Sequence, residues 1–119
     1  MCSTYAVIKV HNEEKTNVKE LNLLVDTGST YTWIHRKHLE GLSILPERRH
    51  KFETIEGRLV ERDVGIAYVE YENITVPTMV VLAEENDKEV LGLHALEGLA
   101  LEVDPTQNKL KKAEAILAI

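Results

Sequence analysis

Hydrophobic and polar residues alternate along much of this chain, in short segments separated by clusters of turn-forming residues. Such alternation, with Val, Ile, Thr and Tyr at many positions, is typical of strands with one buried face. It predicts strands over residues 5–10, 18–25, 31–34, 49–55, 58–71, 74–83, 89–92, 100–103 and 110–119. Two segments, Arg36–Leu42 and Leu93–Leu99, favour short helices instead. We therefore expect an all-β, closed barrel-like fold with one or two short helices.

Turn-forming residues mark the connections between the predicted strands. Glu56-Gly57 favours a tight hairpin turn, because glycine tolerates positive φ. Glu72-Asn73 marks the next turn along the chain. By composition the final segment, 110–119, suits a helix as well as a strand. The Asp104-Pro105 turn before it is typical of a hairpin connection and favours the strand.

Length and composition fit one globular domain. The chain has 119 residues, of which 44% are hydrophobic and 29% charged, and these values are ordinary for such a domain. It contains one Trp, one Phe and four Tyr, so the core must consist mainly of Val, Ile and Leu. We expect residues 1–119 to form a single domain.

The charge of the chain argues against two classes of partner. A formal net charge of −6 would repel both nucleic acid and an anionic membrane surface. Two short basic clusters, at residues 48–51 and 109–112, are interrupted or flanked by other residue types. We interpret both as solvated faces of strands.

The start of the chain lacks the apolar core of a signal peptide. No run approaches the roughly 18 apolar residues of a membrane span. Cys2 is the only cysteine, so no disulfide can form within the chain. These features favour a cytoplasmic protein without a membrane anchor.

Two histidines, His35 and His38, stand three residues apart, a spacing that would let them share a metal ion on one helical turn. Glu40 or His50 would have to complete the site. The two basic residues between the histidines repel a divalent ion, and no Cys or acid occurs at tight ligand spacing. We therefore expect no metal site, and no motif indicates a cofactor.

The strongest chemical signal is Asp26, which directly follows the apolar residues 23–25. A carboxylate beside a buried strand is costly unless it is hydrogen-bonded or shares a proton. The residues that follow, Thr27, Gly28 and Ser29, are all turn formers, so an ordinary Asx-turn is an alternative interpretation. Taken alone, these four residues support a turn and a catalytic site about equally.

This stretch resembles the Asp-Thr-Gly active-site loop of aspartic proteases, and the chain length matches the retropepsin-like (retroviral-type) branch. Val90-Leu91-Gly92 resembles the strand that passes behind that loop and leads into the helix of the family. Thr54–Arg58 lies where the family carries its flap hairpin. The three elements occur in the family order across residues 5–119, and residues 91–105 look like the cellular, non-viral members.

The resemblance implies a peptide hydrolase that acts as a homodimer. In this chemistry two carboxylates share one proton around a water, and one acts as general base while the other donates to the carbonyl oxygen. The chain has a single Asp-Thr-Gly, so the second Asp must come from another copy. The implied substrate is a peptide or an unfolded protein.

The resemblance also suggests roles for the residues after Asp26. Thr27 would hydrogen-bond across the twofold axis, and Gly28 would let the substrate backbone approach. Ser29 would donate its hydroxyl to the outer oxygen of Asp26, which favours the ionised carboxylate and shifts the active pH range to the acid side.

Ile55 and Gly57 would cover the substrate as parts of the flap, while Val90 would line an apolar side-chain pocket. Trp33 suits either such a pocket or the core. His94 departs from the family, because members commonly carry Asp or Asn there to hold the catalytic loop by hydrogen bonds.

Two functions follow from these residues. The first is an aspartic endopeptidase. The alternative is a catalytically weak, protease-like module that dimerises and binds extended peptides as an added strand. The intact Asp-Thr-Gly favours the first, whereas His94 and the single glycine of the hairpin favour the second.

Overall fold

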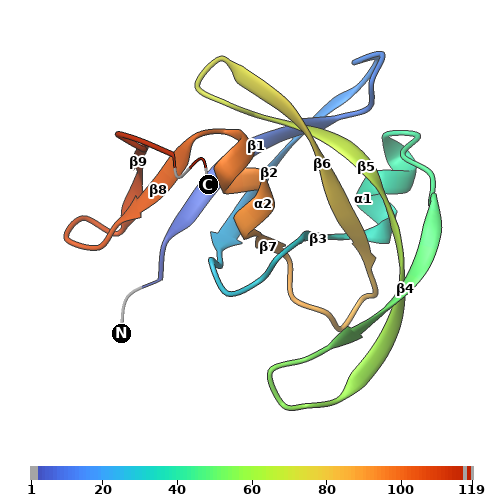
Figure 1. Ribbon diagram of the computed structural model, residues 1–119. Helices are drawn as coiled ribbons and strands as arrows, with labels where there is room; N and C mark the ends of the chain where they lie inside the picture. Colours follow the sequence, from blue (N-terminus) through green and yellow to red (C-terminus); the bar gives the residue numbers. More distant parts are fainter. Residues whose placement is uncertain (1–2, 117, 119) are drawn as a thin grey trace.

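The computed structural model describes residues 3–116 and 118 and shows a mostly β chain with two short helices (Figure 1). The strands are β1 (Tyr5–His11), β2 (Val18–Val25), β3 (Thr32–His35), β4 (Arg48–Glu53), β5 (Leu59–Tyr71), β6 (Ile74–Ala83), β7 (Val90–Leu91), β8 (Leu101–Asp104) and β9 (Lys109–Lys112). The helices are α1 (Arg36–Gly41) and α2 (Leu93–Gly98). Neither helix, within the described residues, is long and apolar enough to cross a membrane. The predicted elements are confirmed to within two residues, except in the C-terminal tail.

The strands form a closed ring. Their order in the main sheet is β1-β2-β7-β3-β6-β5-β4, and β1 also pairs with β5. This second pairing, from Lys9↔Glu70 to His11↔Tyr68, closes the ring through β1, β2, β7, β3, β6 and β5. β4 stays outside the ring, and among the described strands it pairs with β5 alone. The closed all-β arrangement expected from the pattern is confirmed.

The core lies inside the ring and is aliphatic. Every ring strand contributes side chains with no solvent exposure: Ile8, Val10, Leu23, Ile34, Val69, Val80, Leu82 and Leu91. Leu39 from α1 and Leu96 from α2 close the ends of this core. No aromatic residue belongs to the buried core of the described chain, as the sparse aromatic content predicts. The alternating pattern therefore arises because one face of each strand points into the core and the other points to solvent.

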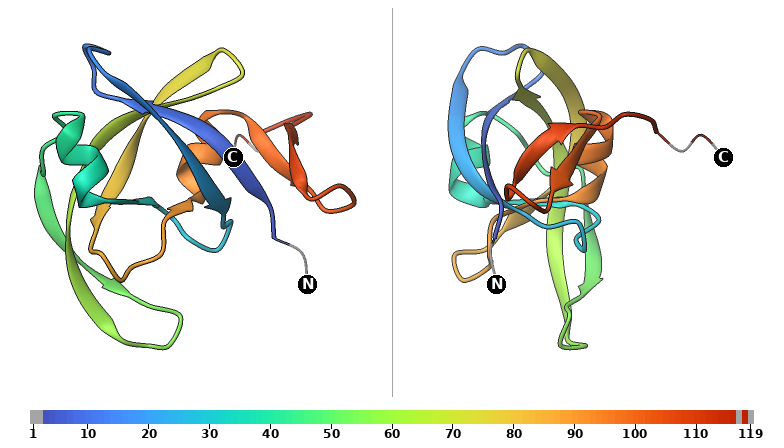
Figure 2. Two further views of the ribbon diagram at one scale, coloured as in Figure 1. Left: turned by 180° about the vertical axis from the view of Figure 1, so that it is seen from behind. Right: turned by 90° about the vertical axis from the view of Figure 1, so that its left-hand side faces the viewer.

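The two hairpins that include β5 differ in their surroundings. At the β5–β6 turn, Glu72 and Asn73 both have positive φ, 48° and 70°, as in a type I′ turn that matches strand twist. The β4–β5 hairpin instead projects away from the ring (Figure 2). The basic residues 48–51 of β4 are exposed there, as expected for a solvated strand face.

The prediction of a strand over residues 110–119 is wrong beyond Lys112. Strand β9 ends at Lys112, and residues 113–116 and 118 are not in a strand; residues 117 and 119 lie outside the described residues. The partner strand, β8, begins at Leu101, which pairs with Lys112. One further bond, from the Ala113 N–H to the Ala100 carbonyl at 2.9 Å, ends the ladder. Without a partner strand, the apolar tail has no ladder to extend.

An ion pair holds the loop between β6 and β7 against the ring. Arg62 on β5 donates two hydrogen bonds to the carboxylate of Asp87, at 2.7 and 3.0 Å. The same carboxylate accepts the N–H of Glu84 at 2.8 Å. The Arg62 guanidinium, as the main cause, holds the pKa of the Asp87 carboxyl below its ordinary value of 3.8. The pair thus fixes the acidic loop that precedes β7.

Asp87→Asn should lower the free energy of unfolding by about 2 kcal/mol at neutral pH, because it removes a charge-assisted hydrogen bond pair. The unfolded chain takes up a proton at the ordinary pKa of 3.8, whereas folded Asp87 does so at lower pH. The contribution is therefore complete above that range and is lost as the pH falls through the folded pKa. Urea unfolding of both proteins at several pH values should show the difference shrinking in acid. A difference that stayed constant with pH would contradict this assignment.

Candidate active site

The loop after β2, residues 26–31, crosses the end of the short strand β7. β7 lies between β2 and β3: it is parallel to β2 through Val25↔Leu91 and antiparallel to β3 through Trp33↔Val90. The N–H of Asp26 donates to the carbonyl of Leu91 at 2.9 Å. The backbone of Asp26 is thereby fixed to the centre of the ring.

Gly92 is required under this loop because there is no space for a side chain. A Cβ at Gly92 would lie 2.3 Å from the carbonyl oxygen of Tyr31 and 2.9 Å from that of Ser29. Its φ of −92° and ψ of 177° are open to any residue, so the constraint is close approach rather than conformation. The Gly92 N–H donates to the buried hydroxyl of Thr32 at 2.9 Å. The Val-Leu-Gly run thus acts as a support of the loop.

The first turn of α2 holds the same loop from the other side. The Leu93 N–H donates to the Ser29 carbonyl at 2.7 Å, and the His94 N–H donates to the Thr30 carbonyl at 3.1 Å. The exposed His94 ring packs edge-on against Tyr31, with centroids 5.5 Å apart. Both bonds from α2 to the loop are therefore made by the backbone, and the absence of Asp or Asn at position 94 leaves them intact.

The carboxylate of Asp26 stands exposed at the surface of the loop. Among the described residues it accepts one hydrogen bond, from the Gly28 N–H to Oδ1 at 2.9 Å. A Cβ at Gly28 would lie 3.2 Å from the same oxygen, so a side chain there would press on the carboxylate. Thr27 beside it is also exposed. The local geometry is an Asx-turn that presents one carboxylate outward on a rigid support.

The predicted hydrogen bond from Ser29 to Asp26 is wrong for this chain. The Ser29 hydroxyl donates to the carbonyl of Tyr31 at 2.8 Å. A hydroxyl has one proton to donate, and this carbonyl, which also faces Gly92, is the acceptor it meets. Ser29 therefore braces the loop, and its hydroxyl proton is not directed at Asp26.

Ser29→Ala should accordingly cost about 1 kcal/mol of stability, because one half-buried hydrogen bond is lost. It should leave the acid limb of any pH–activity profile in place, since Asp26 keeps its own bond. Thermal unfolding and an activity profile of the two proteins would check both outcomes. An acid limb that moved upward would restore the earlier assignment of the hydroxyl to Asp26.

The β4–β5 hairpin carries the two predicted flap residues at its tip. Thr54 closes the turn, accepting the Gly57 N–H and donating to the Arg58 carbonyl, both at 2.8 Å. Gly57 has a φ of +83°, which glycine adopts without strain. Ile55 is fully exposed, with a relative exposure of 104%. In every view the tip stands apart from the loop that carries Asp26 (Figures 1 and 2).

An aromatic cluster connects the base of this hairpin to the loop. Phe52 on β4 packs edge-on against Trp33, with centroids 5.4 Å apart, and against Tyr31 at 6.1 Å. Trp33 is half-buried, whereas its partner Val90 is 6% exposed. The amino-acid pattern did not single out Tyr31 or Phe52 as residues of the site. A signal was present, since few aromatics occur in the chain and these two flank the hairpin and the loop.

The comparison with protein families fits this geometry. The model of the family described as gag-polyprotein putative aspartyl protease matches residues 13–98. The chain belongs to this family. The match includes the Asp26 loop, the β4–β5 hairpin and the Val-Leu-Gly support. No curated protein sequence matches the chain.

Solved structures support the same fold for this aspartyl protease family member. The EIAV protease, complexed with the inhibitor HBY-793, is 17% identical with a TM-score of 0.59; the match covers 98% of this chain and 94% of that one. The retroviral protease-like domain of Ddi1 from Leishmania major is 14% identical with a TM-score of 0.54, covering 94% and 90%. At these identities the likeness establishes the retropepsin-like fold alone.

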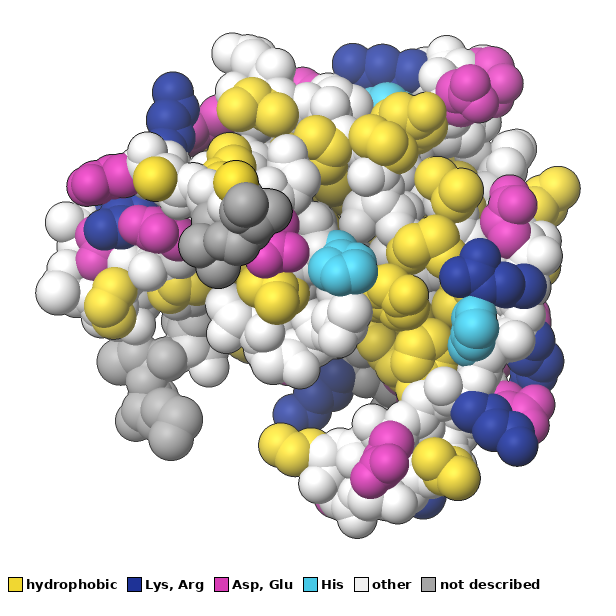
Figure 3. All heavy atoms as spheres, in the orientation of Figure 1, with side chains coloured by type: hydrophobic (Ala, Val, Ile, Leu, Met, Phe, Trp, Pro, Cys, Tyr) yellow, Lys and Arg dark blue, Asp and Glu magenta, His cyan; other side chains and the backbone are white. Residues whose placement is uncertain are grey.

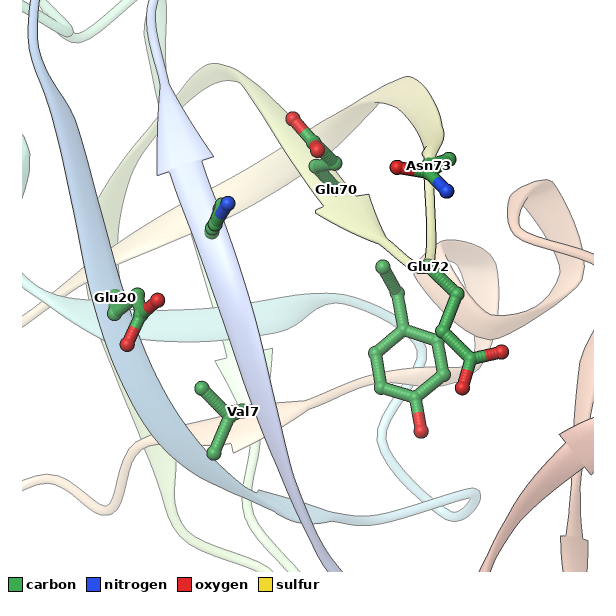
Figure 4. A pocket seen from close by; sticks show the side chains of 7 residues that line it. Val7, Glu20, Glu70, Glu72 and Asn73 are labelled. Atoms are coloured by element: carbon green, nitrogen blue, oxygen red, sulfur yellow. The ribbon is translucent and has the colours of Figure 1, made fainter.

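Several hollows lie on the described surface of this family member. In the space-filling view a notch separates the hairpin tip from the body of the molecule, and hydrophobic side chains gather on the surface above it (Figure 3). A shallow hollow between β1, β2 and the β5–β6 turn carries mostly charged side chains, among them Glu20 and Glu70 (Figure 4). Another lies beside α1 and includes His38. Neither hollow contains Asp26 or the hairpin tip, so the notch is the candidate substrate position.

Proposed function

We propose that this chain is an aspartic endopeptidase that acts as a symmetric homodimer, with one Asp26 from each subunit. The observation that carries the proposal is the Asp26 carboxylate itself. It is exposed, it sits on a loop held by β7, Gly92 and α2, and each chain supplies one. Membership of a putative aspartyl protease family supports this assignment.

One carboxylate is half of the required chemistry. Hydrolysis of an amide by this route needs a base that takes a proton from water and an acid that protonates the carbonyl oxygen. Two carboxyl groups at short distance divide these roles, because like charges so close cannot both ionise and one proton is shared. Aspartic proteases are the established example of such a pair. A second copy of the chain would supply the missing group through an isologous interface.

The notch beneath the β4–β5 hairpin is the proposed place of the substrate. The hairpin tip, with exposed Ile55 and the Gly57 turn, lies on one side of it, and the body of the molecule, which carries the Asp26 loop, lies on the other (Figures 1 and 3). An extended peptide placed there could bond its backbone to the hairpin tip, and closure of the tip would exclude water. Gly28, which carries no side chain, leaves room for the peptide backbone beside the carboxylate.

The proposal is tested by the dependence of cleavage on protein concentration. With an unfolded protein as substrate, activity per chain should rise as the dimer forms and then reach a plateau. Size-exclusion chromatography over the same concentrations should show the elution mass doubling in the same range. Activity per chain that did not depend on concentration, in a protein that eluted as a monomer, would exclude the shared carboxylate pair.

The alternative, a peptide-binding module with weak catalysis, has one observation in its favour. The hairpin tip carries a single glycine and is closed by two backbone hydrogen bonds at Thr54, which limits its freedom to close over a substrate. Peptide binding by the dimer without turnover that depends on Asp26 would select this function.

A further inference from the structure

Three side chains with metal-binding atoms meet at the end of β3 that lies away from the Asp26 loop. They are His35, the last residue of β3, His38 in α1 and Glu89, the residue before β7. One donor atom from each lies within 4.8 Å of the other two. All three side chains are half-buried, with exposures of 24%, 21% and 22%.

The hydrogen bonds of His35 determine which of its nitrogens is free. Nε2 lies 2.9 Å from the backbone carbonyl of Asp87. Because a carbonyl oxygen can only accept, Nε2 carries the proton of the neutral ring and Nδ1 presents its lone pair. Nδ1 faces the Oε1 atom of Glu89 at 3.6 Å. Two electron-rich atoms at this distance repel unless a cation, either a proton or a metal ion, lies between them.

The carboxylate of Glu89 is also held in place. Its Oε2 atom accepts the backbone N–H of His35 at 2.8 Å and stands 3.9 Å from Nε2 of His38. In metal sites, a ligating histidine commonly donates the N–H of its other ring nitrogen to a backbone carbonyl, and ligating carboxylates are themselves hydrogen-bonded. His35 and Glu89 have this arrangement. The Arg62–Asp87 pair fixes the loop that supplies this carbonyl.

We propose that His35 Nδ1, His38 Nε2 and the Glu89 carboxylate form a binding site for a zinc ion. Zinc takes imidazole nitrogen and carboxylate oxygen at about 2.0–2.2 Å in tetrahedral geometry, so that its ligand atoms stand about 3.4 Å apart. The distance from His35 Nδ1 to Glu89 Oε1 is 3.6 Å and that from His38 Nε2 to Glu89 Oε2 is 3.9 Å, both close to this value. The ligand atoms of the two histidines lie within 4.8 Å of each other and would move closer together on binding. A water molecule would complete the tetrahedron.

The basic residues beside the histidines do not prevent this. Arg36 directs its guanidinium away, hydrogen-bonding to Asp63 and forming longer ion pairs with Glu40 and Glu84. Lys37 is exposed to solvent, where water and salt screen its charge. Glu89, the acid that completes the site, is 54 residues from His35 in the sequence. It therefore cannot be found by looking for ligands that are close together in the sequence.

The site would tie together three segments that meet only in the tertiary structure: the end of β3, helix α1 and the β6–β7 loop. α1 has six residues and buries one side chain, Leu39, so a bond from His38 to a shared ion would add a further anchor for this short helix. The hollow beside α1 includes His38, and each of the three side chains retains some solvent exposure. A zinc ion here would act on stability, separately from the carboxylate at the far end of β3.

The test is a titration of the full chain with Zn²⁺, after treatment with a chelator and in a Cys2→Ser background that removes the thiol. Calorimetry should show one ion bound per chain, and the melting temperature should rise as zinc is added. Glu89→Gln and His38→Gln should each weaken zinc binding by about 100-fold or more and abolish the thermal shift. Gln at position 89 still accepts the His35 N–H, so the variant retains that bond.

Two controls separate this site from other metal-binding groups. His50→Gln changes an exposed histidine on β4, outside the cluster, and should bind zinc as the parent does. Asp26→Asn should do the same, because the proposed site does not use the catalytic carboxylate. Circular dichroism of each metal-free variant establishes that it is folded. The His38 side chain makes no hydrogen bond among the described residues, so His38→Gln breaks none. Absence of zinc binding, or equal binding by parent, Glu89→Gln and His38→Gln, would overturn the proposal.

Discussion

Asp26→Asn is expected to abolish cleavage of an unfolded protein, lowering kcat by about 10⁴-fold or more, because neither the general base nor the shared proton remains. The fold should be unaffected. Asp26 is exposed, and an Asn side-chain oxygen can still accept the hydrogen bond that the Gly28 N–H donates to Oδ1. Initial rates and thermal unfolding of the variant and the parent protein would measure the two effects separately.

Mixing the two proteins tests the dimer directly. If the active unit needs one Asp26 from each chain, a mixed dimer is inactive, and excess variant withdraws parent chains into such dimers. With about a threefold excess of Asp26→Asn, activity per parent chain should fall to about a quarter after exchange. An unrelated folded protein at the same concentration serves as control. Activity that stayed constant on mixing would show that each chain acts alone.

Gly92→Ala should have the largest effect on stability of any conservative change at the site. The added Cβ would meet the Tyr31 carbonyl oxygen at 2.3 Å and the Ser29 carbonyl oxygen at 2.9 Å. Both atoms are backbone of the loop that holds Asp26, so the loop must move. Overpacking of this kind costs about 3 kcal/mol, and the displaced carboxylate should lose most of its activity. Urea unfolding would measure the loss of stability, and activity assays would measure the effect on the loop.

Gly41→Ala is the matched control for this substitution. A Cβ at Gly41, the last residue of α1, would meet no atom within 4 Å. Because alanine loses less backbone entropy in a helix than glycine, this variant should gain about 0.5–1 kcal/mol. A similar loss of stability in both variants would show that close packing under the loop is not the cause.

Much of the fold could be predicted because its signals are local. Alternation of burial reveals a strand from its own residues, and a glycine or an asparagine at a turn reports the backbone conformation required there. The chemistry of Asp26 was visible for the same reason, as an acid directly after an apolar run and before Thr27 and Gly28. The tail shows the limit of this reasoning, since an apolar pattern over residues 113–119 cannot indicate whether a partner strand is present.

The set of elements, their order and the one carboxylate suited to acid–base chemistry could therefore be predicted from the residues alone. The tertiary structure was needed to show which distant residues meet. It paired β1 with β5 to close the ring, placed Gly92 beneath Tyr31 and turned the Ser29 hydroxyl from Asp26 to a carbonyl. It also brought Glu89 to His35 across 54 residues. Each of these contacts depends on the path of the whole chain, and no local pattern of burial or charge encodes it.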